Sequence, residues 1–372
     1  MSFSLGRSTA SIWRQADEFR NRLKAIKRAT TLEHTAWYPY DSLAPIEILD
    51  RFLGGEPKRL TELISGKPVV DLGCGDGDVS FFLASLGAEV EAIDYAPTNY
   101  NRMAGINAMK RKLGESRVEI RSADLDRPLE LCAPVYGLAL LMGVLYHLKN
   151  PYSILEMLAH KARYCFLTTR IAALAGDRRT RIDSIPVAYL LDKGEANQDD
   201  TNFWVFSEAG LRRILSRSGW SIVKFATTPN AASSDPASTA GDARAYCLIE
   251  TRVPHPPEGI RLLDGWHAVE NGSWRWTERR FSFAIDEPVE GRTVRLRFYL
   301  APVLFAGRAS VTLRGGEGHP QSYTTPGEHT YECPAAPRIQ FELDTAIGPT
   351  GKDTRELGLQ VQFAEMAPIT LL

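Results

Sequence analysis

Apolar side chains along this chain follow three successive spacings. Between residues 9 and 29 they recur every three or four positions, which predicts an amphipathic helix. From 68 to 169 short apolar runs alternate with helical patterns, as in a parallel sheet that helices cover on both faces. Beyond residue 259 apolar and polar positions alternate in short segments, which is typical of antiparallel strands. The pattern therefore indicates a doubly wound α/β domain followed by a small antiparallel β-sandwich.

A proline-rich segment over residues 251–257 separates these two patterns and has the composition of a linker. The length of 372 residues allows about two or three domains. We expect an N-terminal helical segment over residues 1–45, an α/β domain over 46–252 and the β-sandwich over 259–372.

Two segments interrupt the alternation inside the α/β domain. Residues 171–200 follow the predicted fifth strand, at the edge of the sheet where open α/β proteins bind their substrates. Residues 227–243 are rich in small and polar residues and have no periodicity. The second segment is either a flap or disordered, and we favour disorder.

Composition narrows the classes of partner. The formal net charge of −1 gives no overall field that would recruit nucleic acid or an anionic membrane. The five cysteines are scattered and odd in number, which does not fit a disulfide framework or a metal site. Neither a signal peptide nor an apolar run of membrane-spanning length is visible in the sequence. We therefore expect a cytoplasmic protein without a membrane span.

Three glycines at alternate positions follow the first predicted strand: Gly73, Gly75 and Gly77. Glycine suits a sharp turn from strand to helix and lets a ligand approach the backbone closely. A dinucleotide-binding loop has the spacing G-x-G-x-x-G, whereas the spacing here is G-x-G-x-G. Asp71 precedes the glycines; its carboxylate would repel a pyrophosphate but suits a ligand with an ammonium or sulfonium group.

The next two predicted strands also end in carboxylates. Asp94, followed by Tyr95, ends the second strand, where a carboxylate can accept hydrogen bonds from both ribose hydroxyls of an adenosine. Asp124, followed by Leu125, closes the third strand, where it could bind an adenine amino group. A turn or helix-cap role for Asp124 is the alternative interpretation.

These stations, followed by a fourth strand that ends at Met142 and continues as Gly143–Leu148, resemble the class I S-adenosylmethionine-dependent methyltransferases. The segment Met142–His147 is similar to one in the bacterial family that includes the tRNA wobble-uridine carboxymethyl-transferring enzyme. The resemblance covers roughly residues 10–250. It implies a seven-stranded Rossmann-like methyltransferase sheet and S-adenosyl-L-methionine as cofactor. The expected cofactor-binding residues are Asp71, Gly73, Gly75, Gly77, Asp94, Tyr95, Asp124, Leu125, Met142, Trp37 and Tyr40.

The aromatic segment His34–Tyr40 precedes the sheet and has two open interpretations. In the resembling family this region arches over the cofactor, which implies that Trp37 or Tyr40 closes the site. Alternatively, the aromatic side chains fasten the N-terminal helix to the domain.

Tyr146 and His147 lie just beyond the fourth predicted strand, where the methyl group would lie, and are the catalytic candidates. A histidine there can take a proton from a hydroxyl near neutral pH, although it could also pack under the loop. The substrate-binding candidates are Asn202, Trp204 and Asp200, because amides and carboxylates bind ring hydroxyls and tryptophan stacks on a pyranose. Asp199 and Asp200 are adjacent and project apart, so we predict no metal site.

The β-sandwich contains short motifs that are similar to modules appended to bacterial surface-polysaccharide glycosyltransferases and methyltransferases. These motifs are Gly265–Trp266, Trp274–Thr277 and Asp353–Gly358. Trp274 and Trp276 are two residues apart on one strand face, as a stacking platform for sugars or as part of the core, and we favour the core.

The sequence leaves three functions open. The leading one is O-methylation of a saccharide, either a nucleotide sugar or a surface glycan, in association with glycan-assembly enzymes. The second is tRNA (carboxy)methylation, for which the resemblance implies that the cofactor could be carboxylated; the nearly neutral charge disfavours it but leaves nucleic acid open. The third is a non-catalytic binding or scaffold protein in polysaccharide assembly, against which the glycine loop and its carboxylates argue.

Overall fold

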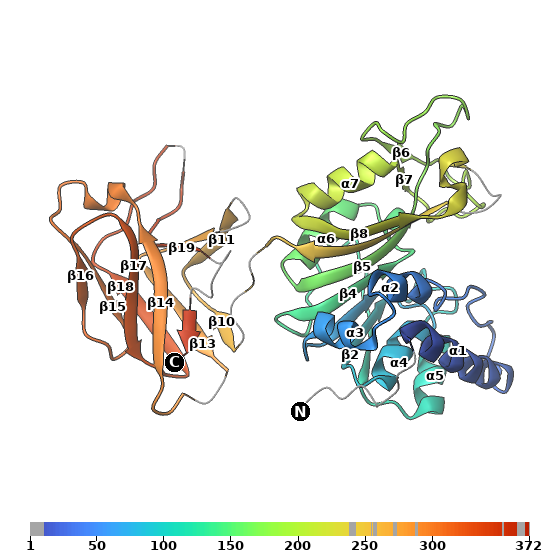
Figure 1. The fold of residues 1–372 in the computed structure, drawn as a ribbon, viewed down its shortest axis with the longest axis horizontal. Coiled ribbons are helices and arrows are strands. Elements are labelled where there is room, and N and C mark those ends of the chain that lie inside the picture. Colours follow the sequence, from blue (N-terminus) through green and yellow to red (C-terminus); the bar gives the residue numbers. More distant parts are fainter. Residues whose placement is uncertain are drawn as a thin grey trace. The chain divides into compact units, whose positions relative to one another are not determined.

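The computed structural model describes residues 11–237, 243–253, 255, 259–270, 274–286, 289–351, 353–362 and 369–371. The chain divides into two compact units, Met1–Thr251 and Arg252–Leu372, which Figure 1 shows in blue to yellow and in orange to red. Among the described residues no helix is long and apolar enough to cross a membrane.

The first unit is built on one seven-stranded sheet with the strand order β3-β2-β1-β4-β5-β9-β8. Strands β1 to β5 run parallel, whereas β9 is antiparallel to both β5 and β8. This confirms the predicted Rossmann-like sheet and the hairpin at its edge. The strands are β1 (Val69–Leu72), β2 (Val90–Asp94), β3 (Val118–Ser122), β4 (Tyr136–Met142), β5 (Ala162–Arg170), β8 (Trp220–Thr227) and β9 (Arg244–Thr251).

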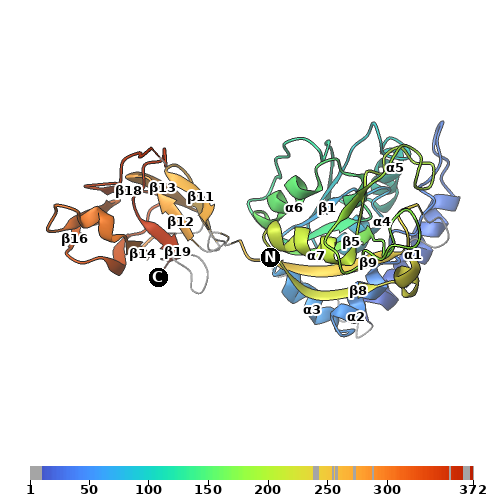
Figure 2. The ribbon, with the colours of Figure 1, turned by 90° about the horizontal axis from the view of Figure 1, so that it is seen from above.

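Helices cover both faces of this sheet; Figure 2 shows α7 and α2 on opposite sides of β8 and β9. Helices α1 to α5 contribute to one apolar core with the sheet, to which Phe82, Ile106 and Leu138 belong. The N-terminal helix packs into the same core through Phe19 and Leu23. The helices are α1 (Ile12–Arg28), α2 (Ile46–Phe52), α3 (Pro57–Ile64), α4 (Asp78–Ser85), α5 (Ala104–Leu113), α6 (Pro151–Ala159) and α7 (Glu208–Arg217).

Local sequence signals account for several element ends. Pro151 opens α6, where its missing N–H costs nothing. The hydroxyl of Ser207 accepts a hydrogen bond from the Gly210 N–H and caps α7, as expected. All residues of β1 are buried, since helices cover both faces of a parallel sheet.

The insertion after β5 forms a two-stranded sheet of β6 (Ala188–Leu190) and β7 (Trp204–Phe206), which Figure 1 shows above the main sheet. The expectation of disorder over 227–243 is wrong for its described part, since Pro229–Ser233 forms a 3-10 helix. The carbonyl of Ser234 accepts hydrogen bonds from the N–H groups of Ala173 and Leu174, which ties this part to the insertion. Residues 238–242 lie outside the described residues.

The second unit is a β-sandwich whose two antiparallel sheets have the orders β10-β13-β18-β15-β16 and β11-β12-β19-β14-β17, with β20 paired to β14. Alternating apolar residues from both sheets, such as Phe341 and Leu296, form its core. Trp276 is buried and Trp274 half-buried, in keeping with a packing role. The strands are β10 (Ile260–Leu262), β11 (Trp266–Glu270), β12 (Trp274–Thr277), β13 (Arg280–Ile285), β14 (Thr293–Leu300), β15 (Val311–Gly315), β16 (Gln321–Tyr323), β17 (Gly327–Pro334), β18 (Arg338–Leu343), β19 (Gln360–Gln362) and β20 (Ile369–Leu371).

Because each unit has its own apolar core, a chain that ends after Arg252 should fold and bind S-adenosylhomocysteine as the full chain does. Circular dichroism on heating and calorimetric titration check this. Aggregated protein, or loss of cofactor binding, would show that the second unit completes the first. The further division of the first unit at residue 45 stays a prediction.

Candidate active site

The loop after β1 carries three glycines in the left-handed region: φ is +73° at Gly73, +57° at Gly75 and +78° at Gly77. A Cβ on Gly73 would lie 2.2 Å from Cγ2 of Val144, and one on Gly77 would lie 2.7 Å from Ile106 Cγ1. Only glycine fits at Gly73 and Gly77, because φ is positive at both positions and there is no room for a Cβ atom. The tight packing against Val144 holds the loop against the turn that follows β4.

Asp94, at the tip of β2, fastens this loop. Its Oδ2 accepts a hydrogen bond from the Gly75 N–H at 2.8 Å, and its Oδ1 accepts one from the Tyr95 N–H at 2.7 Å. Each carboxylate oxygen has a second lone pair, so the group can still accept bonds from two ribose hydroxyls. The carboxylate thus fits an adenosine bound beside a loop that it holds in place.

Asp71 is buried in the middle of the sheet and is only 3% exposed. It accepts a hydrogen bond from the Ser80 hydroxyl at 2.6 Å. Burial raises the pKa of the Asp71 carboxyl to about 7, since a charge in an apolar site is unfavourable. A cation such as an ammonium group would favour its ionised form, which fits the expected role beside the methionine part of the cofactor.

Asp124 lies in a turn. Its Oδ1 accepts a hydrogen bond from the Asp126 N–H at 3.0 Å, which agrees with the alternative interpretation from the sequence. Binding of adenine by Asp124 and by the half-buried Leu125 stays a prediction.

In the aromatic segment, Tyr38 is the residue that lies over the glycine loop: a Cβ on Gly75 would be 3.7 Å from its ring. Burial raises the pKa of Tyr38 to about 12, so the phenol stays protonated. Trp37 instead donates from Nε1 to the Thr30 carbonyl and fastens the segment to the end of α1, whereas Tyr40 is 70% exposed. The sequence identified this segment but not Tyr38 within it.

Tyr146 and His147 lie after β4 as expected, and the centroids of their rings are 4.2 Å apart. Nδ1 of His147 lies 3.1 Å from the carbonyl oxygen of Thr201 and 2.9 Å from its hydroxyl. That hydroxyl donates its proton to Asp199 Oδ1 at 2.6 Å. Because both Thr201 oxygens can only accept from the ring, Nδ1 carries the proton and Nε2 is left as the basic atom.

Burial lowers the pKa of His147, and the charges of Arg244 and Arg170 lower it further, whereas Asp199 and the Thr201 carbonyl oppose the shift. The imidazole is therefore neutral at pH 7, as a proton acceptor must be. Met142, the last residue of β4, is half-buried beside this turn.

The three predicted substrate residues are in different environments. Asn202 is buried, and its amide donates to the Ala196 carbonyl inside the insertion. Trp204 is half-buried, and its Nε1 donates to the Lys149 carbonyl at 3.3 Å. Asp200 is exposed, while its neighbour Asp199 is linked to His147 through Thr201. Substrate contact by these three residues stays a prediction.

Two arginines that the sequence analysis did not select complete this end of the site. Arg170 ends β5 and Arg244 begins β9, and the Arg244 guanidinium carbon lies 5.8 Å from the centroid of the Tyr146 ring. Arg170 could have been selected from the sequence, because it is a basic residue at the end of the predicted fifth strand. Arg244 follows a long irregular segment, so no local pattern marked it.

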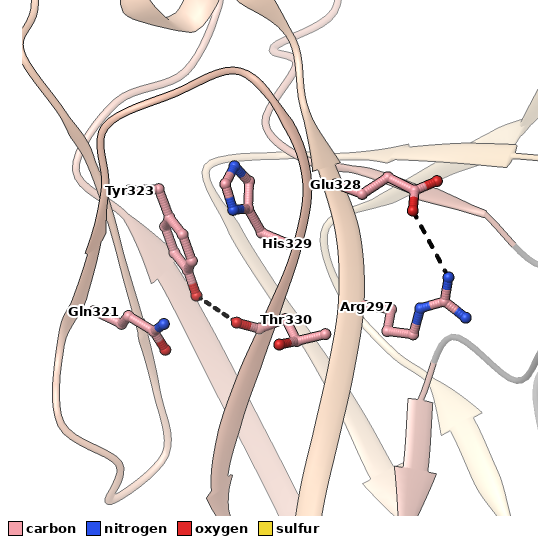
Figure 3. Close-up of a pocket in the computed structure, with 6 residues that line it drawn as sticks. All are labelled: Arg297, Gln321, Tyr323, Glu328, His329 and Thr330. Carbon is pink, nitrogen blue, oxygen red and sulfur yellow. Dashed lines mark hydrogen bonds and ion pairs between the residues drawn. The ribbon is translucent and has the colours of Figure 1, made fainter.

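The second unit has a polar pocket of about 410 Å³, shown in Figure 3. The Tyr323 hydroxyl donates to the Thr330 carbonyl at 2.8 Å, and the Tyr323 and His329 rings are 4.7 Å apart. Arg297, Gln321 and Glu328 complete the lining with groups that hydrogen-bond hydroxyls. Among the described residues there is no group of three or more side chains that could hold a metal ion.

Replacing Gly73 with alanine should destabilise the protein more than replacing Gly114. Both residues have φ above +60°, so alanine is strained at either position by about 1 to 2 kcal/mol. At Gly114 nothing lies within 4 Å of the added Cβ, whereas at Gly73 Val144 is in the way. Urea denaturation measures the free energy of unfolding of both variants. If both lose the same stability, the loop and Val144 can move apart at no cost.

Comparisons with known proteins find similarity in the first unit. Residues 46–224 match the model of a methyltransferase domain. Among curated relatives, a ubiquinone biosynthesis O-methyltransferase from Leptothrix cholodnii is 26% identical over 149 residues, which are 39% of this chain and 62% of the relative. One from Burkholderia pseudomallei is 28% identical over 209 residues, 54% of this chain and 83% of the relative.

Among solved structures, the N-terminal domain of EvdMO1 with SAH and D-fucose has a TM-score of 0.41 and 17% identity, and the match covers 62% of this chain and 97% of that one. The chain spans less than two thirds of the first of the curated relatives. Residues 46–224 thus correspond to a methyltransferase domain.

Proposed function

We propose that this methyltransferase domain transfers the methyl group of S-adenosyl-L-methionine to a hydroxyl of a saccharide, either a nucleotide sugar or a glycan end. The observation that carries the proposal is the polar cluster beyond β4, where Tyr146, His147 and Arg244 lie together. A hydroxyl-rich acceptor suits such a cluster, since its hydroxyls can both donate and accept hydrogen bonds.

The residues around the glycine loop fit the cofactor. Asp94 would accept bonds from the ribose, Asp71 would lie toward the ammonium group, and Tyr38 would cover the loop at Gly75. The cofactor supplies an electrophilic methyl group on a sulfonium. The protein then has to position the acceptor oxygen, exclude water and remove a proton.

His147 is suited to remove that proton. Its Nε2 is the basic atom because Nδ1 donates to Thr201, and its lowered pKa keeps it neutral at pH 7. The acceptor oxygen would take the methyl group as its bond to the sulfonium sulfur breaks and a neutral thioether leaves, and Nε2 would hold the proton that the hydroxyl gives up. Tyr146, whose ring packs on His147, would orient the same hydroxyl.

The names of the curated relatives favour oxygen as the acceptor atom, and they also suggest a second candidate, a phenolic hydroxyl. Arg170 and Arg244, two charged residues at the end of β5 and the start of β9, favour a polar acceptor over an apolar phenol. In the second unit, the pocket that contains Gln321, Glu328 and His329 would hold a further part of a glycan. Association with glycan-assembly enzymes belongs to the same proposal.

A methyl-transfer assay with labelled cofactor tests the proposal. Nucleotide sugars, a catechol and purified tRNA are each offered at low and moderate salt. We expect label on a sugar. The amount of label should depend little on salt, because a short saccharide carries few charges for the protein to neutralise. Label on tRNA alone, weakening steeply with salt, or on the catechol alone, would overturn the saccharide assignment.

A further inference from the structure

The insertion that follows β5 is fastened to the turn after β4 on both sides of His147. The Phe203 N–H donates a hydrogen bond to the Tyr146 carbonyl at 2.8 Å. Nε1 of Trp204 donates one to the Lys149 carbonyl at 3.3 Å. Tyr146 precedes His147 and Lys149 follows it, so a segment that is distant in sequence holds the backbone around the histidine.

Thr201 and Asp199, from the same insertion, reach the ring of His147. Nδ1 lies 2.9 Å from the Thr201 hydroxyl oxygen and 3.1 Å from the Thr201 carbonyl oxygen. The hydroxyl and the backbone N–H of Thr201 both donate to Asp199 Oδ1, at 2.6 and 2.9 Å. Because the hydroxyl gives its proton to a carboxylate, its oxygen can only accept from Nδ1.

The resulting relay runs from a carboxylate through a hydroxyl to an imidazole. A general base is effective when a third group fixes its tautomer and its orientation. Here the two Thr201 oxygens fix Nδ1 as the protonated atom, and Asp199 fixes the Thr201 side chain in turn. Nε2 is therefore left to accept a proton.

Charged groups on three elements act on the His147 ring. Burial lowers the pKa of His147, and the charges of Arg244 on β9 and Arg170 on β5 lower it further, whereas Asp199 in the insertion raises it. Tyr146, the titratable neighbour on the turn itself, packs its ring against the imidazole. A protonated ring would thus face two positive charges, and Asp199 supplies a negative charge that stabilises it.

We propose that Asp199 and Thr201 are positioning residues for methyl transfer, which hold His147 so that Nε2 accepts the proton of the acceptor hydroxyl. This inference rests on the proposed function and adds two residues to it. The O–H bond of the acceptor breaks and an N–H bond forms at Nε2, while the methyl group passes from the sulfonium sulfur to the oxygen and a neutral thioether leaves. The imidazolium keeps donating from Nδ1 to Thr201, beside the carboxylate of Asp199, and then releases the Nε2 proton to water.

Nitrogen-15 NMR of the full chain, labelled at histidine and saturated with S-adenosylhomocysteine, tests the inference without an acceptor. The chain has seven histidines, and His147→Gln identifies the signals of His147. At pH 8 we expect a proton on Nδ1 and none on Nε2. A proton on Nε2 instead would overturn the inference, since the atom proposed as the base would already be protonated.

Two changes at Asp199 separate its hydrogen bond from its charge. In Asp199→Ala the Thr201 hydroxyl can turn its proton to Nδ1, so the ratio of the two tautomers should shift at least about threefold toward Nε2–H. In Asp199→Asn an acceptor for the hydroxyl remains but the charge is lost, so the pKa of His147 should fall below its value in the natural protein. Unchanged tautomers and an unchanged pKa in both variants would overturn the inference.

Thr201→Ser and Asp192→Asn are the matched controls. The serine keeps the hydroxyl and should keep the natural tautomer, whereas Thr201→Val should shift the ratio toward Nε2–H. Asp192 is an exposed carboxylate of the same insertion that accepts a hydrogen bond from the Lys193 N–H. Its change to asparagine should leave the signals of His147 in place. Loss of the natural tautomer in Thr201→Ser would contradict the relay, because the hydroxyl would then not be what sets it.

Steady-state kinetics with the acceptor that the labelled-methyl assay identifies complete the test. Asp199→Asn and Asp199→Ala should lower kcat at least about tenfold and change KM less than about threefold, because the acceptor still binds but its proton is accepted less well. An unchanged kcat in both variants would refute the role in methyl transfer. Label on tRNA or on a catechol alone would refute the saccharide instead, and kcat on that acceptor then decides about the relay.

Discussion

Asp94→Ala should weaken the binding of S-adenosylhomocysteine at least tenfold. The change removes the acceptor for the ribose hydroxyls and also frees the Gly75 and Tyr95 N–H groups, so the loop loses its anchor. Hydrogen bonds to a charged group contribute about 1.5 to 3 kcal/mol each, and about 1.4 kcal/mol corresponds to a tenfold change in affinity. Isothermal titration at pH 7.5 measures the loss.

Asp177→Ala is the control for this change. The Asp177 carboxylate also accepts two backbone hydrogen bonds, from Arg179 and Thr180, but it lies in an exposed turn of the insertion. It should leave the affinity unchanged. If Asp94→Ala binds S-adenosylhomocysteine as tightly as the natural protein does, Asp94 does not bind the ribose.

Asp71→Asn should have opposite effects on stability and on cofactor binding. In the folded protein the pKa of Asp71 is about 7, against 3.8 for an ordinary aspartate. The folded form therefore holds more protons than the unfolded form between these values, so ionisation of Asp71 lowers the free energy of unfolding as pH rises through this window. The asparagine variant should be more stable than the natural protein at pH 8, by about 2 to 4 kcal/mol, and equally stable near pH 3.

In cofactor binding the natural protein should surpass the asparagine variant. An ammonium group beside Asp71 favours the carboxylate, so the affinity of the natural protein for S-adenosylhomocysteine should rise by up to about tenfold per unit between pH 6 and 7 and level off above. The variant should bind more weakly at pH 8, with a nearly flat pH profile over this range. Urea denaturation and titration at pH 3, 6, 7 and 8 give both quantities. Parallel pH profiles for the two proteins would show that Asp71 does not meet the ammonium group.

The order of elements and the glycine loop were determined by the sequence alone. Buried parallel strands must be apolar throughout, and a backbone with positive φ packed against Val144 must use glycine. Both requirements act on neighbouring residues, so they leave a local pattern. The same holds for Asp94, whose position follows from the end of β2. The alternation of apolar residues likewise predicted the sandwich strands.

The arrangement of side chains beyond β4 and β5 was decided only by the tertiary structure. Arg170 and Arg244 are partners through the register of β5 with β9, and Asp199 rather than Asp200 reaches His147 through Thr201. Tyr38 lies over Gly75 because its N–H donates to Asp76, 38 residues further along the chain. Such contacts join residues that are distant in sequence, and a change in register of a single residue would reverse which side chains face the site. Local spacing therefore located the glycine loop and the strand ends beside it, whereas long-range pairing determined which charged side chains lie near them.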